Sequence, residues 1–228
     1  MKRLVIFGAG DLARVAQFYF SHDSEYEVAA FTVHERFVQG EEFGGLPLVA
    51  FETVEECYAP DEFEMFVAVG YKQLNRARAE VYGAAKKKNY RLASYVNSKA
   101  VHFGEVNCGD NCFILEANVI QPFVTIGNNV VLWSGNHVGH DVAIEDHCFV
   151  SSHVVLAGHV RVGEFSFLGV NACVKDGVTI GANCLIGPGA VILKDTQPGS
   201  AHLVEGMPAS AIPAARVARF LTGERGGR

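Results

Sequence analysis

The residues best suited to catalysis lie in two short segments of the second half of the chain. The run His137-Val-Gly-His140-Asp141 places a carboxylate beside an imidazole, and Gly158 and His159 follow eighteen residues after that pair. A neutral imidazole can take a proton from a nucleophile, and a neighbouring carboxylate orients the ring and stabilises the imidazolium. A glycine amide beside such a base can hydrogen-bond a developing oxyanion. Together these are the groups that an acyl transfer requires.

A six-residue repeat determines whether these side chains meet. Every sixth residue between positions 96 and 192 gives seventeen positions, of which fifteen are Ile, Leu or Val. This period fits neither an α-helix nor a lone strand and is typical of a hexapeptide parallel β-helix with one short strand per hexad. With three hexads in each coil, residues eighteen apart lie one strand layer from each other. His140 is therefore expected beneath Gly158, and Asp141 beneath His159.

A less specific interpretation competes with this one, because outward-facing His and Asp residues on a β-helix are often only solvated surface. The stacking of the two segments favours chemistry over that interpretation, although less so for His137. The same counting puts His147 and His153 on the other two faces of the coil. We expect these two histidines to be surface or subunit-interface residues.

The second inward position of each hexad, four residues after the first, carries no large or charged residue. Asn118 and Asn136 occupy it on successive coils, where their side chains can form a hydrogen-bonded ladder. Cys112, Cys148 and Cys184 share it two coils apart, at roughly 9.6 Å, which no disulfide can bridge. Because the sequence also lacks a CxxC pair, we expect reduced thiols and a cytoplasmic protein.

The first ninety-odd residues follow a different pattern, in which apolar runs alternate with helical periodicity. Strands are expected at 4–7, 28–33, 46–49, 65–69 and 92–96, and helices at 12–20 and 74–88. This alternation predicts a small α/β domain with a mainly parallel sheet. The expected division is an α/β domain at 1–93, an all-β parallel β-helix at 94–207 and a C-terminal cap or helix at 208–228.

A glycine-rich turn joins the first predicted strand to the first predicted helix. Gly8-Ala-Gly10-Asp11-Leu-Ala13 is a GxGxxA sequence whose amides can hold a pyrophosphate at the helix N-terminus. A nicotinamide dinucleotide would need an acidic residue at the end of the second strand, where the chain has Phe31-Thr-Val-His34. A dinucleotide redox cofactor is therefore disfavoured.

Composition excludes several classes of partner. The 228 residues carry a formal charge of −6 and a pI near 5.8, which gives no electrostatic footprint for nucleic acid. No stretch approaches the roughly 20 apolar residues that a membrane span needs. The opening Met1-Lys-Arg-Leu4 run meets Gly8 too soon for a secretory signal, so a first β-strand is expected there.

The repeat region resembles the left-handed β-helix acyltransferases of the hexapeptide-repeat superfamily over residues 96–210. The stretch from His137 to Ile144, followed by Leu156-Ala-Gly-His-Val160, is similar to the UDP-N-acetylglucosamine acyltransferases of lipid A synthesis. That resemblance implies a left-handed coil and a homotrimer with active sites between subunits. It also implies a catalytic base at His140, its partner at Asp141, an oxyanion donor at Gly158 and a substrate contact at His159.

Nearly the whole chain is similar to bacterial sugar acetyltransferases that act on UDP-4-amino sugars, sialic acid or perosamine. The features that support this similarity are the domain order, the glycine-rich start and the sequence Gly206-Met-Pro-Ala209, which resembles the Gly-x-Pro-Ala motif at the end of these β-helices. The resemblance implies a Rossmann-like front domain for a nucleotide sugar and a groove for acetyl-CoA along the β-helix. It assigns acetyl-CoA contacts to Phe149, Val170 and Pro188, and further substrate contacts to Gly8, Gly10, Asp11, Gly70, Arg76 and Trp133.

The chain departs from these enzymes at four places. Ser210 replaces the basic residue of their closing motif, and His34 stands directly after the second predicted strand, where they typically carry acidic residues. Asp11-Leu-Ala13 replaces their Gly-His-Gly, and Trp133 stands where the amino-sugar enzyme carries Asn. The sugar, the nucleotide and the choice between N- and O-acetylation therefore stay open.

The sequence thus predicts an acetyl-CoA-dependent sugar acetyltransferase of bacterial surface-glycan synthesis, with no metal. Two alternatives are retained. The first is a γ-carbonic-anhydrase-like lyase with zinc on His137, His140 and His159, because three imidazoles suit that metal. The second is an inactive trimeric scaffold.

Overall fold

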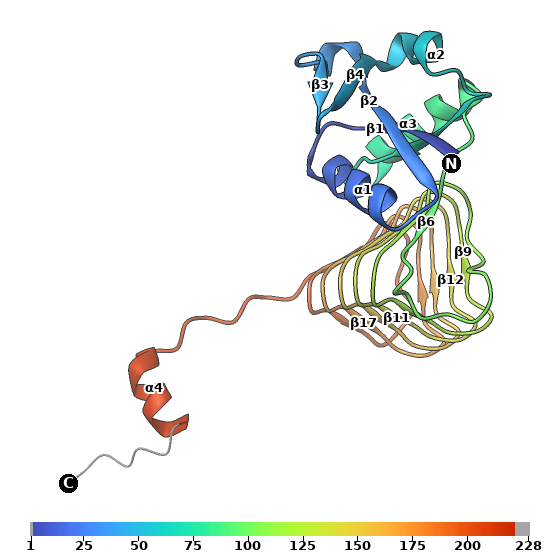
Figure 1. The fold of residues 1–228 in the computed structure, drawn as a ribbon. Helices are drawn as coiled ribbons and strands as arrows, with labels where there is room; N and C mark the ends of the chain where they lie inside the picture. Colours follow the sequence, from blue (N-terminus) through green and yellow to red (C-terminus); the bar gives the residue numbers. More distant parts are fainter. Residues whose placement is uncertain (1, 222–228) are drawn as a thin grey trace.

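The computed structural model describes residues 2–221 and places an α/β front domain on one side of a three-sided solenoid (Figure 1). The front sheet has the strand order β3-β4-β2-β1-β5, and its neighbours are parallel except β3 with β4. Its strands are β1 (Lys2–Phe7), β2 (Tyr26–Val33), β3 (Glu42–Phe43), β4 (Leu46–Ala50) and β5 (Phe63–Val67). The mainly parallel sheet agrees with the sequence prediction, apart from the short β3.

Helices cover both faces of this sheet. They are α1 (Asp11–His22), α2 (Val54–Cys57) and α3 (Arg76–Lys87), with 3-10 turns at Glu35–Phe37 and Phe51–Thr53. Side chains alternate between the two faces of a strand, so Leu4 and Ile6 pack with α1 while Val5 and Phe7 pack with α3. The α1 cluster also contains Phe113 of the solenoid, so α1 lies between the sheet and the solenoid.

The solenoid consists of two-residue strands that stack in parallel into three sheets, as the hexapeptide repeat predicts. The front-domain face contains β6 (Tyr95–Val96), β7 (Phe113–Ile114), β10 (Val131–Leu132), β13 (Phe149–Val150), β16 (Phe167–Leu168), β19 (Leu185–Ile186) and β21 (Ala201–His202). The second face contains β8 (Val119–Ile120), β11 (His137–Val138), β14 (Val155–Leu156), β17 (Cys173–Val174) and β20 (Val191–Ile192). The third contains β9 (Thr125–Ile126), β12 (Ala143–Ile144), β15 (Arg161–Val162) and β18 (Thr179–Ile180).

The stacking register confirms the eighteen-residue coil. Val131 pairs with Phe149, and Phe149 pairs with Phe167, which are each eighteen positions apart. The expected amide ladder is also present, because Asn136 Nδ2 donates to Asn118 Oδ1 at 2.9 Å. Parallel stacking of hexad strands is what a left-handed β-helix requires.

The first coil differs from the prediction. His102, at a sixth-residue position, is exposed and its Nδ1 contacts the Gly104 carbonyl at 2.8 Å, because an imidazole gains nothing from an aliphatic core. The strand expected at 92–96 is divided as well. Leu92 forms an isolated bridge with Met65 of the front sheet, whereas Tyr95 pairs with Phe113 of the solenoid.

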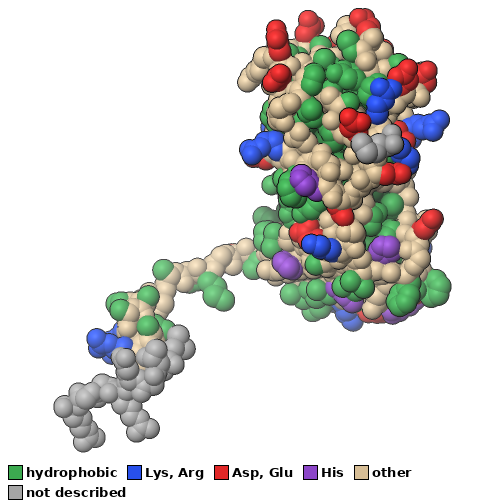
Figure 2. Space-filling model, viewed as in Figure 1, with side chains coloured by type: hydrophobic (Ala, Val, Ile, Leu, Met, Phe, Trp, Pro, Cys, Tyr) green, Lys and Arg blue, Asp and Glu red, His purple; other side chains and the backbone are tan. Residues whose placement is uncertain are grey.

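The three faces differ in their outward side chains. The front-domain face presents mainly aromatic residues, several of them buried under the front domain. The second face, named here the valine face, presents Val101, Val119, His137, Val155, Cys173 and Val191, each eighteen residues from the next. Its four valines are 37 to 62% exposed. Figure 2 shows hydrophobic side chains along the lower edge of the solenoid, where β11 and β17 lie in Figure 1. The third face, the polar face, presents Thr125, Ala143, Arg161 and Thr179.

The remaining expectations concern thiols and the C-terminal segment. All six cysteines are free, and Cys112, Cys148 and Cys184 are buried in the solenoid core. The segment after residue 208 contains the helix α4 (Ala214–Leu221), which extends away from the solenoid (Figure 1). The part of the predicted segment beyond residue 221 lies outside the described residues. In the described part of the chain, no helix is both long and apolar enough to span a bilayer.

Candidate active site

The turn between β11 and β12, together with the matching turns of the neighbouring coils, forms what we name the histidine corner. It joins the valine face to the polar face, and so lies opposite the face that carries the front domain. Asp141 and His159 have φ angles of 58° and 59° at equivalent corner positions. Asp and His are among the residues that tolerate this left-handed conformation best, so the turn itself favours these residue types.

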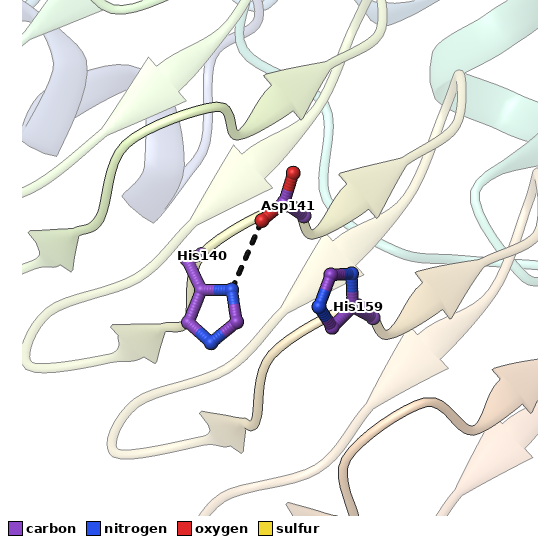
Figure 3. Close-up of side chains that lie close together, drawn as sticks. All are labelled: His140, Asp141 and His159. Atoms are coloured by element: carbon purple, nitrogen blue, oxygen red, sulfur yellow. Dashed lines mark hydrogen bonds and ion pairs between the residues drawn. The ribbon is translucent and has the colours of Figure 1, made fainter.

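His140 and Asp141 form a hydrogen-bonded pair at this corner. His140 Nδ1 lies 3.0 Å from Asp141 Oδ2, and both side chains are about half exposed (Figure 3). A carboxylate on Nδ1 holds the proton there and leaves Nε2 as the basic nitrogen. The Gln121 side chain accepts a hydrogen bond from the backbone amide of His140 at 2.8 Å, which anchors the turn from the preceding coil.

Gly158 lies one coil from His140, directly against the free nitrogen of its ring. A Cβ at Gly158 would meet His140 Nε2 and Cε1 at 2.6 Å, so only glycine leaves room for the imidazole in this position. Gly158 is buried, and its amide donates to no acceptor within the described part of the chain. Because buried backbone amides nearly always have a hydrogen-bond acceptor, an amide without one is suited to donate to the oxyanion of a bound substrate.

His159 completes the group that the spacing predicts. Its ring lies 4.9 Å from that of His140 in an edge-to-face arrangement (Figure 3), and its amide donates to the His140 carbonyl at 2.9 Å. Potential ligand atoms of His140, Asp141 and His159 all lie within 4.8 Å of one another. This set differs from the zinc set expected for a lyase, because Asp141 takes the place of His137, whose side chain belongs to the valine face.

The predicted nucleotide-sugar residues lie around the front domain. Gly8 has a φ of 134°, and a Cβ there would meet the Ala68 carbonyl oxygen at 2.7 Å, so the tight turn requires glycine. Gly10 is the N-cap residue of α1, with open space where a Cβ would stand. Asp11 follows as the first residue of α1 and borders a cavity of about 780 Å³ between α1 and the solenoid.

The large cavity also contains a carboxylate with two donors. Glu116 accepts hydrogen bonds from Tyr19 at 2.6 Å and Ser134 at 2.7 Å. Burial acts to raise the pKa of Glu116, but these hydrogen bonds outweigh it and lower that pKa below its usual value. Burial and the same hydrogen bond raise the pKa of Tyr19 to about 12. Glu116 is therefore an acceptor that stays ionised.

A second cavity, of about 270 Å³, lies between the front domain and the corner that joins the front-domain and valine faces. Its lining includes Gly70, Trp133, Phe149 and Val170 from the predicted set, and it is mainly apolar. Pro188 is exposed one coil beyond Val170. Phe149 is buried, because it packs against Trp133 and against Tyr71 of the front domain.

Arg76, which the sequence predicts as a phosphate contact, is exposed at the start of α3 and contacts the solenoid. Its guanidinium donates to Asn183 Oδ1 at 2.6 Å and lies 5.0 Å from the Phe165 ring. Both partners lie in turns that join the polar face to the front-domain face, Phe165 between β15 and β16 and Asn183 between β18 and β19. The glycine turn packs against Thr32 of β2 and against Ala68, which directly follows β5.

The predicted residues thus form two groups in one chain. His140, Asp141, Gly158 and His159 meet at the histidine corner, whereas Phe149, Val170 and most of the predicted sugar contacts lie by the front domain. Two further residues of the corner, Gln121 and Asp176, were not predicted from the sequence. The eighteen-residue spacing from Gly158 contained the signal for Asp176, while Gln121 is nineteen residues from His140 and carries no such signal.

Comparison with known proteins gives a sequence match to the repeats. The pattern of the bacterial transferase hexapeptide family (six repeats) matches residues 124–158 and 159–194. An acyl-[acyl-carrier-protein]–UDP-N-acetylglucosamine O-acyltransferase from Nautilia profundicola is 33% identical over 101 residues, or 41% of this chain and 39% of that protein. The Stutzerimonas stutzeri protein of the same name is 38% identical over 71 residues, or 31% and 28%. The matches therefore span well under half the length of these relatives.

Solved structures are similar over most of the chain. PerB from Caulobacter crescentus, in complex with CoA and GDP-perosamine, has a TM-score of 0.78 and 27% identity, covering 90% of this chain and 95% of that one. The acetyltransferase domain of PglB from Neisseria gonorrhoeae has a TM-score of 0.79 and 24% identity, covering 90% and 97%, and shows the fold alone. Residues 124–194 therefore carry the repeats of the bacterial transferase hexapeptide family, in a chain with the fold of acetyltransferases of known structure.

Proposed function

We propose that this protein is an acetyl-CoA-dependent acetyltransferase that acts on an amino or hydroxyl group of a nucleotide-activated sugar, in bacterial surface-glycan synthesis. The observation that carries the proposal is the histidine corner, where His140 pairs with Asp141 through Nδ1 and directs Nε2 over Gly158. The similarity to PerB, whose structure contains CoA and GDP-perosamine, supports the choice of donor and acceptor.

The chemistry follows from these positions. His140 Nε2 takes the proton of the acceptor nitrogen or oxygen while that atom attacks the thioester carbonyl carbon. The Gly158 amide donates to the oxyanion of the tetrahedral intermediate. When the carbon–sulfur bond breaks, the thiolate takes the proton back from Nε2 and leaves as the CoA thiol. Asp141 stabilises the imidazolium between the two proton transfers.

The separation of the two residue groups supports an active site that is shared between subunits. His140 lies at the corner opposite the front-domain face, so the cavities near Gly10 and Trp133 of the same chain lie by another face. Exposed valines are costly in water, at roughly 25 cal/mol per Å² of apolar surface. The valine face reaches from the corner with Val170 to the corner with His140. Its burial between the copies of a homotrimer would bring one chain's His140 toward the front domain of another.

The proposed acetyl-CoA contacts are Phe149, Val170 and Pro188. Val170 and Pro188 continue a column with Ser134 and Ser152, each eighteen residues from the next. This uncharged column suits a pantetheine arm that lies along the coils. The apolar cavity beside Val170 would then receive part of the donor.

A direct test is thiol release from acetyl-CoA in the presence of nucleotide-activated amino sugars and their hydroxyl analogues, with sedimentation to give the oligomeric state. We expect release that depends on an acceptor, from a trimer. Stoichiometric zinc with hydration of carbon dioxide would instead establish the lyase. Failure to bind acetyl-CoA in calorimetry would favour the scaffold.

A further inference from the structure

Asp176 lies in the same column as His140, one coil beyond Gly158 and two beyond His140. Its Oδ2 is 2.9 Å from the point where a Gly158 Cβ would stand, and His140 Nε2 is 2.6 Å from that point. Both distances start from the same Cβ position, so the distance between His140 Nε2 and Asp176 Oδ2 is at most their sum, about 5.5 Å. The base and the carboxylate thus approach the same side of Gly158 from its two neighbouring coils.

The carboxylate of Asp176 has no partner in the described part of the chain. No hydrogen bond or ion pair involves it there, although Lys194 stands one coil further along the column. Asp141, by contrast, is engaged by His140. Among the described residues, Asp176 is therefore the free anion of the histidine corner.

One nitrogen atom fits this geometry. Hydrogen bonds of 2.7–3.2 Å from one tetrahedral donor atom to both Nε2 and Oδ2 would span about 4.4–5.2 Å, which is within the upper limit for these two atoms. An amine or ammonium can donate to both acceptors at once, whereas a hydroxyl has only one hydrogen to donate. A hydroxyl that donates to His140, as the chemistry requires, would place its lone pairs against the Asp176 carboxylate.

We propose that Asp176 determines acceptor specificity by holding the amino group of an amino sugar beside His140, in preference to a hydroxyl group. This inference rests on the proposed function. The ammonium binds to both groups and releases one proton to solvent, and the amine then attacks the thioester carbon. A second proton passes from nitrogen to Nε2 as the carbon–nitrogen bond forms, and it reaches the CoA sulfur when the carbon–sulfur bond breaks. Asp176 only accepts the hydrogen bond from nitrogen and takes no part in the proton transfers.

The test compares Asp176→Asn with the wild type on a matched pair of nucleotide sugars, one with the amino group and one with a hydroxyl group in its place. A charge at this distance in a partly solvated site contributes a factor of about ten. We expect the KM for the amino sugar to rise about tenfold, and to rise less at high salt because salt screens the charge. We expect kcat for the amino sugar and the KM for acetyl-CoA to stay within about twofold. The KM for the hydroxyl sugar should fall, because the substitution removes the repulsion between the carboxylate and the hydroxyl lone pairs. Glu164→Gln removes the same charge at another corner and serves as the control.

Two results would overturn the inference. Unchanged kinetics in Asp176→Asn would show that the carboxylate has no role, and an equal fall in kcat for both sugars would show that it acts through His140. Calorimetric binding of the two sugars in the presence of CoA separates this inference from the proposed function. The protein could bind the amino sugar more tightly than the hydroxyl sugar, lose this preference in Asp176→Asn, and yet show no turnover. That result would refute the proposed transferase activity but support the amine-binding site.

Discussion

The substitution Arg78→Met tests how the front domain is attached to the solenoid. Arg78 of α3 is 1% exposed, and its hydrogen-bond acceptors within the described residues are carbonyl and amide oxygens rather than carboxylates. Its guanidinium donates to the carbonyls of Gly70 at 3.2 Å, Asn129 at 3.2 Å and His147 at 3.0 Å. These bonds link the loop beside the smaller cavity to the turn between the polar and front-domain faces.

Two opposing effects determine the size of the change. Burial lowers the pKa of Arg78 to about 10, which corresponds to about 3 kcal/mol of desolvation that an apolar side chain would recover. Methionine would leave three carbonyls without their donor, at about 1–3 kcal/mol each. The loss of hydrogen bonds exceeds the recovered desolvation, so we expect Arg78→Met to reduce the free energy of unfolding by about 3 kcal/mol.

The assay is urea unfolding followed by the fluorescence of Trp133, the one tryptophan of the chain, which borders both cavities at this junction. Arg91→Met, at an exposed arginine of the front domain, is the matched control and should change the free energy by less than about 0.5 kcal/mol. Arg78→Lys should give an intermediate loss, because an ammonium has three donors and lacks the planar fork. Equal midpoints for Arg78→Met and Arg91→Met would show that the buried guanidinium does not hold the two domains together.

Three other variants test the surroundings of the site and the packing of the chain. Glu116 has a lowered pKa, so its contribution to stability is present above the pKa of the unfolded chain and is lost as the pH falls through the folded value. Glu116→Gln should therefore flatten the decline of the melting temperature below about pH 4.5, and an unchanged acid slope would contradict this assignment. A Cβ at Gly139 would lie 2.8 Å from the Gly158 nitrogen, so Gly139→Ala should displace the oxyanion donor and cost about 1–3 kcal/mol of stability. Gly83→Ala, in α3 with open space around it, should instead stabilise the chain by about 0.5–1 kcal/mol, and similar melting temperatures for these two variants would count against the tight packing at Gly139.

Much of the solenoid was predictable because each coil repeats the same physical constraint. One inward aliphatic residue per hexad determines the core, and the eighteen-residue coil then places His140 over Gly158. The amide ladder of Asn118 and Asn136 follows from the same count. Asp176 was within reach of that count as well, but only the geometry shows its carboxylate directed toward Gly158.

What the sequence did not reveal comes from contacts between the domains, which no periodicity encodes. Arg78 has the pattern of an ordinary helix residue, yet docking of α3 buries it among carbonyls. Arg76 contacts Asn183 and Phe165, because the same docking turns the start of α3 toward the solenoid. Phe149 stands on an outward position and is nevertheless covered by Tyr71 of the front domain.

The proposed function depends above all on His140 as the general base of an acetyl transfer. The decisive quantity is kcat for thiol release from acetyl-CoA by His140→Ala, with the best amino sugar acceptor and with unchanged sedimentation and melting temperature as evidence of folding. We expect kcat to fall by about 10²–10⁴-fold. A variant that stays within about threefold of the wild type would show that another group takes the proton.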